Sequence, residues 1–191
     1  MTTVRYFEER DAEIVGKLIA DTYSMFNLSF ASYEERDLFL GPFRYARSPE
    51  TSHKEAIAQV IKSAMVFVAE DDGEIVGVLR GRKDRLASLF VREDHHRQGI
   101  GRQLVERFEL ECLRQGATAI RVAATLYAVP FYLAVGYKRS TGVRRGGSFQ
   151  GRGLKIQPMR KLLRNTERGR HGKGARPTPA SSRHASASAS G

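Results

Sequence analysis

The stretch His96-Arg97-Gln98-Gly99-Ile100-Gly101-Arg102 lies between a strand-like run, residues 87–91, and an amphipathic helical pattern that continues to about Gln115. Glycines at 99 and 101 allow a tight turn and a close approach of the backbone to a ligand. The first amides of the following helix have no partner within the helix and carry a partial positive charge. The stretch therefore predicts an anion-binding site at the beginning of a helix.

Two common glycine-rich loops do not match these residues. A P-loop requires lysine and then serine or threonine after its last glycine, whereas Arg102-Gln103-Leu104 follows Gly101. A dinucleotide fingerprint requires a third glycine where Leu104 stands, and an acid about 20 residues later at the end of a second strand. The run Ile120-Arg121-Val122-Ala123 offers no such acid. Both exclusions argue against a nucleoside triphosphate and a dinucleotide.

A third kind of loop does match. Residues 96–102 resemble the pyrophosphate loop of the GNAT N-acetyltransferase family, which follows the pattern Arg/Gln-x-x-Gly-x-Gly/Ala. Further along, residues 127–137 (Tyr-Ala-Val-Pro-Phe-Tyr-Leu-Ala-Val-Gly-Tyr) are similar to the family's second signature, an Ala-x-x-Phe-Tyr helix that ends in Gly-Phe or Gly-Tyr. With both signatures in the family's order, the chain is identified as a member. The resemblance covers residues 65–161 well and the N-terminal part only in the order of its elements.

The resemblance implies an α+β fold with a mixed central sheet of about six to seven strands flanked by helices. It also implies that the fourth and fifth strands splay apart around coenzyme A. The implied reaction transfers an acetyl group from acetyl-CoA to a primary amine of a small molecule or peptide, by direct attack in a ternary complex and without a metal. We expect residues 1–163 to form this domain.

The resemblance also assigns residues to the coenzyme A site. The strand before the loop would hydrogen-bond the pantetheine arm through its backbone, and the loop amides would hold the pyrophosphate. His96 departs from the family by standing at its Arg/Gln position, and Tyr127 stands where many relatives carry an asparagine. The expected contacts are Leu89, Phe90, Val91, His96, Arg97, Gln98, Gly99, Ile100, Gly101, Arg102 and Tyr127.

Tyr132 is the expected catalytic residue, because it matches the tyrosine that lies near the coenzyme A sulfur in many relatives. A phenol can act as a weak general acid toward a departing thiolate. No motif marks a general base. Glu70, Glu93 and His95 are conceivable bases, directly or through water, and none of them is assigned.

Length and composition agree with one globular domain. The chain has 191 residues, of which 41% are hydrophobic, and this suits one sizeable core. No apolar run approaches the roughly 18 residues that span a bilayer. The start of the chain lacks a signal peptide's apolar stretch, and its one cysteine, Cys112, excludes an internal disulfide. We expect a cytoplasmic protein in which Cys112 is a buried, inert thiol, and a homodimer is possible.

Charge is distributed unevenly along the chain. Residues 1–137 contain 18 Lys+Arg and 20 Asp+Glu. Residues 138–163 contain eight Lys+Arg and no acid, and residues 164–191 contain six Lys+Arg and one acid. The last segment lacks large apolar residues, so we expect a disordered basic tail rich in serine and alanine. Contact with nucleic acid is expected only through this tail.

Two features bear on the acceptor. An aromatic segment, residues 23–45, is expected opposite a basic final hairpin, which suits an amine that also carries a carboxylate or phosphate, or an acidic peptide segment. A solvated, charge-protected edge hairpin is the alternative interpretation. A second function also stays open: a non-catalytic module that binds acyl-CoA and contacts nucleic acid or a protein partner through the hairpin and tail.

The apolar periods and turn residues predict the remaining elements. Asp11 is expected to cap a helix that buries Ile14 with its neighbours, and Ser52 to begin a capping box with Glu55. Asp72-Gly73 predicts a hairpin turn. Strands are expected at residues 4–6, 65–70, 75–80, 119–124, 137–144 and 153–161, and further helices at 33–40 and 130–135.

Overall fold

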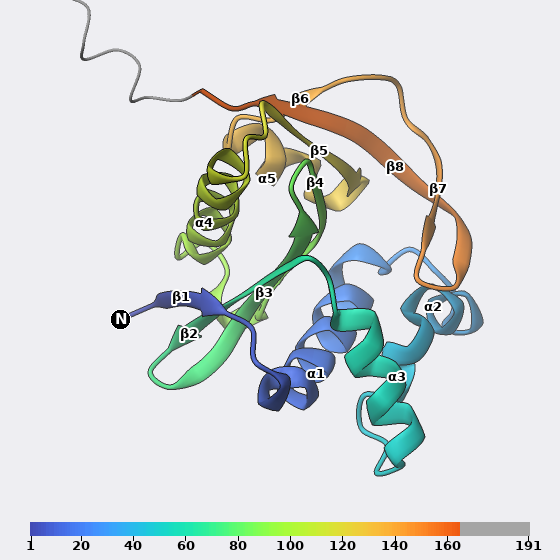
Figure 1. Cartoon of the computed structure of the whole chain (residues 1–191). Helices are drawn as coiled ribbons and strands as arrows, with labels where there is room; N and C mark the ends of the chain where they lie inside the picture. Colours follow the sequence, from blue (N-terminus) through green and yellow to red (C-terminus); the bar gives the residue numbers. More distant parts are fainter. Residues whose placement is uncertain (165–191) are drawn as a thin grey trace, which may run out of the picture.

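The computed structural model describes residues 1–164, which form a mixed eight-stranded sheet with helices on both faces (Figure 1). The strand order is β1-β2-β3-β4-β5-β8-β6, and β7 pairs with β8 beside β6. Only the β4–β5 pair is parallel. The strands are β1 Thr3–Tyr6, β2 Met65–Asp71, β3 Glu74–Arg82, β4 Arg85–Val91, β5 Ala119–Thr125, β6 Lys138–Arg139, β7 Arg144–Ser148 and β8 Gly151–Leu162.

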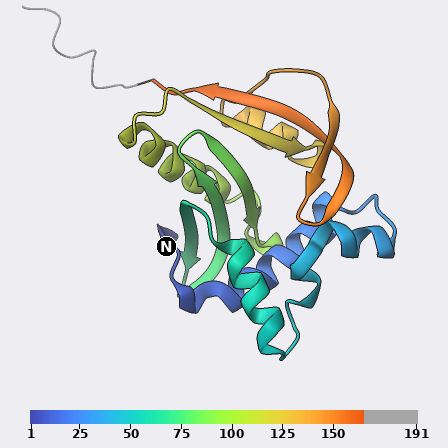
Figure 2. The ribbon, with the colours of Figure 1, turned by 45° about the vertical axis from the view of Figure 1, so that its right-hand side comes forward.

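The helices cover opposite faces of this sheet, as the turned view in Figure 2 shows. One face carries α1 Ala12–Thr22, α2 Tyr33–Leu40 and α3 Thr51–Ile61, and the other carries α4 Ile100–Arg114 and α5 Val129–Ala134. Short helical turns join them: η1 Glu9–Asp11, η2 Tyr23–Asn27, η3 Gly41–Tyr45, η4 Glu93–His95 and η5 Leu126–Ala128. The fold class and the mixed sheet expected from the sequence are confirmed, with eight strands.

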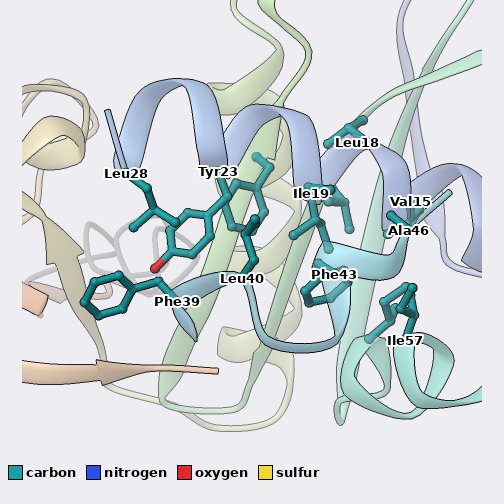
Figure 3. Packing of buried hydrophobic residues seen from close by; sticks show 14 of the residues in the cluster. Val15, Leu18, Ile19, Tyr23, Leu28, Phe39, Leu40, Phe43, Ala46 and Ile57 are labelled. Carbon is teal, nitrogen blue, oxygen red and sulfur yellow. The ribbon is translucent and has the colours of Figure 1, made fainter. Parts of the chain in front are cut away.

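Each face has its own apolar core. Figure 3 shows the first, in which Ile19 and Tyr23 of the N-terminal helical region pack toward Phe39, Phe43 and their neighbours. The second lies between the sheet and α4, where Phe108 and Leu104 are fully buried. Cys112 is also fully buried there, as expected, and burial raises the pKa of its thiol to about 12. The two cores hold the central strands rigidly from both sides.

Several local predictions are confirmed. The β2–β3 hairpin turns at Asp72 and Gly73, both of which have positive φ as a two-residue type I′ turn requires. The helix after the glycine loop is α4, and α2 spans the residues expected for it. Within residues 1–164 no helix combines the length and apolar content that crossing a membrane requires. The predicted basic tail lies outside the described residues, apart from Arg164 at its start.

Four local predictions are wrong. Asp11 does not cap α1: its carboxylate accepts a bidentate pair from Arg5, at 2.7 and 3.0 Å, and the Glu8 amide. The predicted capping box fails because α3 begins at Thr51, which places Ser52 inside the helix. Ile14 is half-exposed instead of buried, because Val15 takes the core position. The strand expected over 137–144 is reduced to the two residues of β6.

Candidate active site

Strands β4 and β5 separate soon after they begin. They pair only at Arg85 with Arg121 and at Leu86 with Val122. The next residue, Ala87, is an extra residue of β4, since Arg80 and Gly81 of β3 pair with Ser88 and Leu86. A bulge of this kind bends its strand and increases the local twist. The bulge at Ala87 therefore coincides with the point where β4 leaves β5.

The separated part of β4 presents unpaired backbone to the gap. The Arg92 amide donates to the Val76 carbonyl of β3 at 2.8 Å, which fixes the alternation of hydrogen-bonding directions along β4. The amides and carbonyls of Leu89 and Val91 then face away from β3, toward the gap. Phe90 pairs with Val78 of β3 and contributes its side chain instead. Of the three residues expected to bind through their backbone, Leu89 and Val91 are so placed.

The glycine loop leads from the end of β4 into α4. Arg97 and Gly99 have φ of 63° and 84°, and the Gln98 side chain donates to the Asp94 carbonyl at 2.9 Å. Nothing lies within 4 Å of a Cβ added at Gly99, so its surroundings are open. The first helical hydrogen bond runs from the Gln103 amide to the Gly99 carbonyl, which leaves the amides before it without helical partners. This open helix N-terminus fits a bound phosphate group.

The loop side chains point in different directions. His96 turns inward: its Nε2 lies 2.7 Å from the Val91 carbonyl oxygen and its ring packs on Phe26, with 4.8 Å between centroids. Phe26 also stacks on Tyr127 at 5.5 Å, so three rings meet near the separated ends of the strands. Arg102 donates to the Ala134 carbonyl at the end of α5 at 3.4 Å. Arg97 is exposed, and Ile100 is buried in the core.

A cavity of about 310 Å³ occupies the gap between the strands. Tyr132 of α5 reaches it from one side, while Tyr23 and Asn27 of η2 and the tip of the β7–β8 hairpin contribute on the other. The side-chain amide of Asn27 donates to the Thr125 hydroxyl at 2.6 Å, and the Tyr23 and Ser148 hydroxyls lie 2.5 Å apart. Burial raises the pKa of Tyr23 to about 12 and also raises that of Tyr132. Both phenols are therefore neutral at physiological pH.

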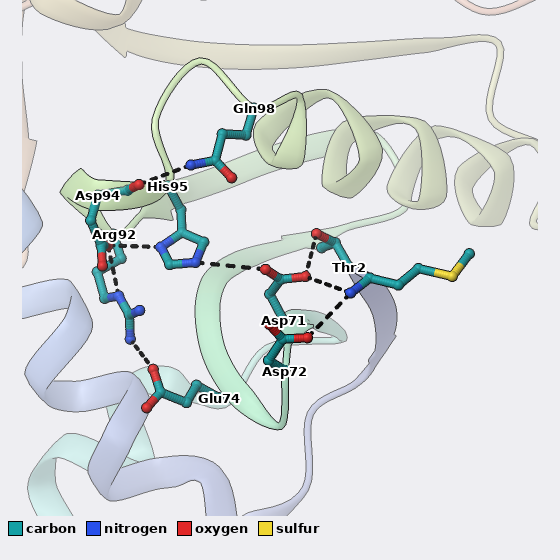
Figure 4. A network of polar contacts seen from close by, with 9 residues as sticks. Thr2, Asp71, Asp72, Glu74, Arg92, Asp94, His95 and Gln98 are labelled. Carbon is teal, nitrogen blue, oxygen red and sulfur yellow. Dashed lines mark hydrogen bonds and ion pairs between the residues drawn. The ribbon is translucent and has the colours of Figure 1, made fainter.

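The conceivable general bases do not line this cavity. Glu70 pairs with Arg5, whose hydrogen bonds lower the pKa of its carboxyl. His95 lies between Asp94, at 2.7 Å, and Asp71, at 3.8 Å, as Figure 4 shows. Glu93 lines a separate hollow of about 640 Å³ beside α1. Among the described residues, the cavity wall contains no carboxylate and no imidazole.

Sequence reasoning missed several groups on the wall. The largest omission is Arg80, a charged residue that follows the apolar run 75–79 within β3. A charge at that place in a central strand was the one available signal, because such strands are normally apolar where a sheet is covered on both faces. The other omitted polar residues are Tyr23, Asn27, Arg85, Ser88, Thr125 and Ser148.

Comparisons with known proteins agree with this geometry. Residues 32–163 match the model of the acetyltransferase (GNAT) domain. A GCN5-related N-acetyltransferase from Rhodopseudomonas palustris has a similar structure, with 18% identity, 85% of this chain and 96% of that chain covered, and a TM-score of 0.69. The PaiA N-acetyltransferase from Thermoplasma acidophilum, solved with coenzyme A, is 17% identical; 85% of this chain and 99% of that chain are covered, and the TM-score is 0.63. YncA from Salmonella typhimurium, solved with acetyl-CoA, is 19% identical; 94% of this chain and 99% of that chain are covered, and the TM-score is 0.55. This chain belongs to the GNAT acetyltransferase family.

Proposed function

We propose that the chain is an N-acetyltransferase that transfers the acetyl group of acetyl-CoA to a primary amine of a small molecule or peptide, by direct attack in a ternary complex. The observation that carries this proposal is the separation of β4 from β5 after two residue pairs. It joins unpaired strand backbone, an open helix N-terminus and a cavity with a buried tyrosine along one path.

The residues present fit acetyl-CoA, which supplies a reactive acetyl thioester when it is bound. The amide and carbonyl of Leu89 and the amide of Val91 would pair with the amide groups of the pantetheine arm in the manner of an added strand. The amides at the beginning of α4 would hold the pyrophosphate, and each charge-assisted hydrogen bond would contribute about 1.5–3 kcal/mol. Tyr127 is half-exposed beside this path. His96 would act by fixing the Val91 carbonyl and Phe26, since its ring faces inward.

Tyr132 would hold a proton at its hydroxyl throughout the working pH range. Because burial raises its pKa well above the ordinary value of about 10, complete transfer of that proton to a thiolate of pKa near 8.5 is unfavourable. A hydrogen bond donated toward the leaving sulfur is the role that suits this environment. The structure of the site thus favours stabilisation of developing charge over full proton transfer.

Replacing Tyr132 by phenylalanine is expected to lower kcat by about 10- to 100-fold without abolishing turnover, because a thiolate is already a fair leaving group. Tyr137→Phe is the matched control. Its ring packs 5.5 Å from that of Tyr132, but Tyr137 does not line the cavity. Steady-state rates of thiol release measure both variants, and an unchanged rate for Tyr132→Phe would remove this residue from the mechanism.

The described wall offers no base to deprotonate the acceptor. The amine would therefore have to enter the cavity already neutral, or lose its proton to water. We therefore expect kcat/KM to rise tenfold per pH unit up to the pKa of the acceptor amine, because only the neutral amine attacks. The measurement is a pH profile with two acceptors whose ammonium pKa values differ by about one unit. Profiles that break at the same pH for both acceptors would instead indicate a base on the protein.

A second candidate function is supported by the basic edge of the sheet. Seven exposed cations there form no ion pair within the described residues, and two pairs of like charge lie directly opposite, Lys138 with Arg160 and Arg145 with Lys155. Such pairs are destabilising unless an anion lies between them. Exposed cations in this arrangement suit a non-catalytic acyl-CoA-binding module that holds nucleic acid or an acidic partner. The seven residues are Lys138, Arg139, Arg144, Arg145, Arg152, Lys155 and Arg160.

Two measurements separate the candidates. An enzyme releases thiol from acetyl-CoA with at least one amine of a broad panel. A binding module binds acetyl-CoA without turnover and binds duplex DNA with an affinity that falls steeply between 50 and 200 mM salt, as counterion release requires (roughly 10³-fold or more). The domain boundary at residue 163, the cytoplasmic location and a homodimer stay predictions from the sequence.

A further inference from the structure

The wall of the cavity between β4 and β5 carries positive charge that nothing on the wall balances. Arg80 of β3 and Arg85 of β4 both line it, and no carboxylate does among the described residues. Both cations come from the end at which the two strands still pair, whereas Asn27 and Thr125 meet at the end where the strands have separated. The closed end of the cavity is therefore cationic.

Arg80 is held in place by backbone. Its side chain reaches the last turn of α3, where Nε donates to the Ile61 carbonyl at 3.0 Å and Nη2 donates to the Val60 carbonyl. Burial lowers the pKa of this guanidinium to about 10, so it is still protonated at neutral pH. A guanidinium has five N–H donors, and the second terminal nitrogen, Nη1, has no partner within residues 1–164. The two backbone carbonyls orient the Arg80 guanidinium, but they carry no net charge and so leave its positive charge uncompensated.

The strand register brings a second polar group to Arg80. Ser88 of β4 is its direct partner across the β3–β4 ladder, and the Arg92 amide bond makes this a hydrogen-bonded pair with Cα atoms about 5.5 Å apart. The Ser88 hydroxyl is buried without a partner in the described part of the chain. Arg85 begins β4 three residues earlier and is exposed, with no ion pair there. Two guanidinium groups and one hydroxyl thus gather around the closed end.

We infer that the closed end of this cavity binds a carboxylate of the acceptor, so that the substrate class is compact amines that carry a carboxylate, such as free amino acids. This inference rests on the proposed function, since it places the acceptor in the same cavity as Tyr132. Arginine forks bind carboxylates through paired, charge-assisted hydrogen bonds. Because the end of the pantetheine arm would share this cavity of about 310 Å³, only a compact acceptor fits beside it.

The same charges act on the amine. A nearby cation lowers the pKa of an ammonium group and so increases the fraction of the neutral, attacking form. A polyamine has no carboxylate to offset this repulsion and is excluded from the closed end. The cationic wall therefore selects the acceptor and also assists its deprotonation, which agrees with the lack of a base on the described wall.

A purely structural role for Arg80, as a cap on α3, would make its replacement lower stability without changing which acceptors are used. The readout must therefore be selectivity. We compare kcat/KM for each common amino acid with that for its carboxamide. We also replace Arg85 by glutamine, because its side chain makes no hydrogen bond or ion pair within the described residues. Arg82→Gln is the matched control, because Arg82 is exposed on the same hairpin, lies 3.7 Å from Asp84 and does not line the cavity.

The parent enzyme is expected to favour at least one acid over its amide by tenfold or more. Arg85→Gln should lower kcat/KM for the acid by about 10- to 100-fold, as expected for a lost bond between charged groups. Its rate with the amide should fall by no more than about threefold, because only the effect of the charge on the ammonium pKa is lost there, and Arg82→Gln should leave both rates unchanged. Arg80→Lys, which keeps the charge but loses the fork, should show a smaller loss with the acid. Equal use of acids and amides, or equal losses for both in Arg85→Gln, would overturn the inference.

A binding measurement keeps this test independent of turnover. An N-acetylated amino acid and its amide are titrated calorimetrically into the complex of the protein with coenzyme A, for the parent and for Arg85→Gln. Tighter binding of the acid that is lost in the variant supports the carboxylate site even if no amine is acetylated, in which case only the proposed function fails. Ethanolamine phosphate is added to the acceptor panel, and faster acetylation of it than of any amino acid would overturn the carboxylate assignment.

Discussion

Replacing Gly101 by valine is expected to weaken coenzyme A binding by at least about 100-fold while the chain stays folded. Gly101 is the second residue of α4, and a Cβ there would lie 3.1 Å from the Phe131 ring. A branched side chain would crowd that ring and block close approach of a phosphate to the helix N-terminus. The loss of two charge-assisted hydrogen bonds accounts for the factor of about 100.

Phe131 links this change to catalysis as well as to binding. Its ring packs edge to face on Tyr132 at 5.2 Å, so a displaced Phe131 is also expected to move the Tyr132 side chain, which lines the cavity. Gly101→Ala should give a smaller loss, since the ring has to move by only a few tenths of an ångström. Calorimetric titration with coenzyme A gives the dissociation constants, and saturating rates report on Tyr132.

Gly142→Val is the control for the same replacement. Gly142 is exposed, has no atom within 4 Å of an added Cβ and does not line the cavity. It should bind coenzyme A like the parent chain. A Gly101→Val protein that melts normally and binds coenzyme A within threefold of the parent would show that the pyrophosphate does not lie at the beginning of α4.

The parts of the site that could be predicted are those encoded by neighbours in the sequence. A strand, two glycines and an amphipathic helix follow one another within about 30 residues, and each element restricts its own backbone locally. The loop at Gly99 and the helix that follows therefore appear where expected. Tyr132 lines the cavity, and its catalytic role stays a prediction; its place could be expected because most of its motif lies within one short helix.

The missed parts depend on register and on distant partners. Arg80 reaches the cavity because a bulge at Ala87 sets it opposite Ser88, and no periodicity within β3 or β4 alone predicts that offset. The error at Asp11 has the same origin. Its spacing before a helix favours a cap, but Arg5, which also holds Glu70, competes successfully for the carboxylate through bidentate hydrogen bonds. Contacts between elements decided both positions.

Gly81→Ala is expected to lower the free energy of unfolding by about 2–4 kcal/mol, which is a fall of roughly 5–15 °C in Tm for a chain of this size. A Cβ at Gly81 would lie 2.6 Å from the Phe108 ring and 2.7 Å from the Arg85 carbonyl oxygen. A side chain can move away, whereas the carbonyl belongs to β4 just before its bulge. The glycine thus permits the close approach at which β4 bends away from β5.

Gly77→Ala on the same strand is the matched control, because its nearest neighbour is the movable end of Leu104 at 3.0 Å. It should cost less than about 1 kcal/mol in urea unfolding. Adding Phe108→Leu to Gly81→Ala separates the two contacts, since the smaller side chain relieves only the crowding against the ring. Partial recovery is expected, because the clash with the Arg85 carbonyl remains. Full recovery of stability would show that the backbone of β4 adjusts freely at the bulge. Gly81 would then not be the residue that fixes the separation of β4 from β5, on which the cavity depends.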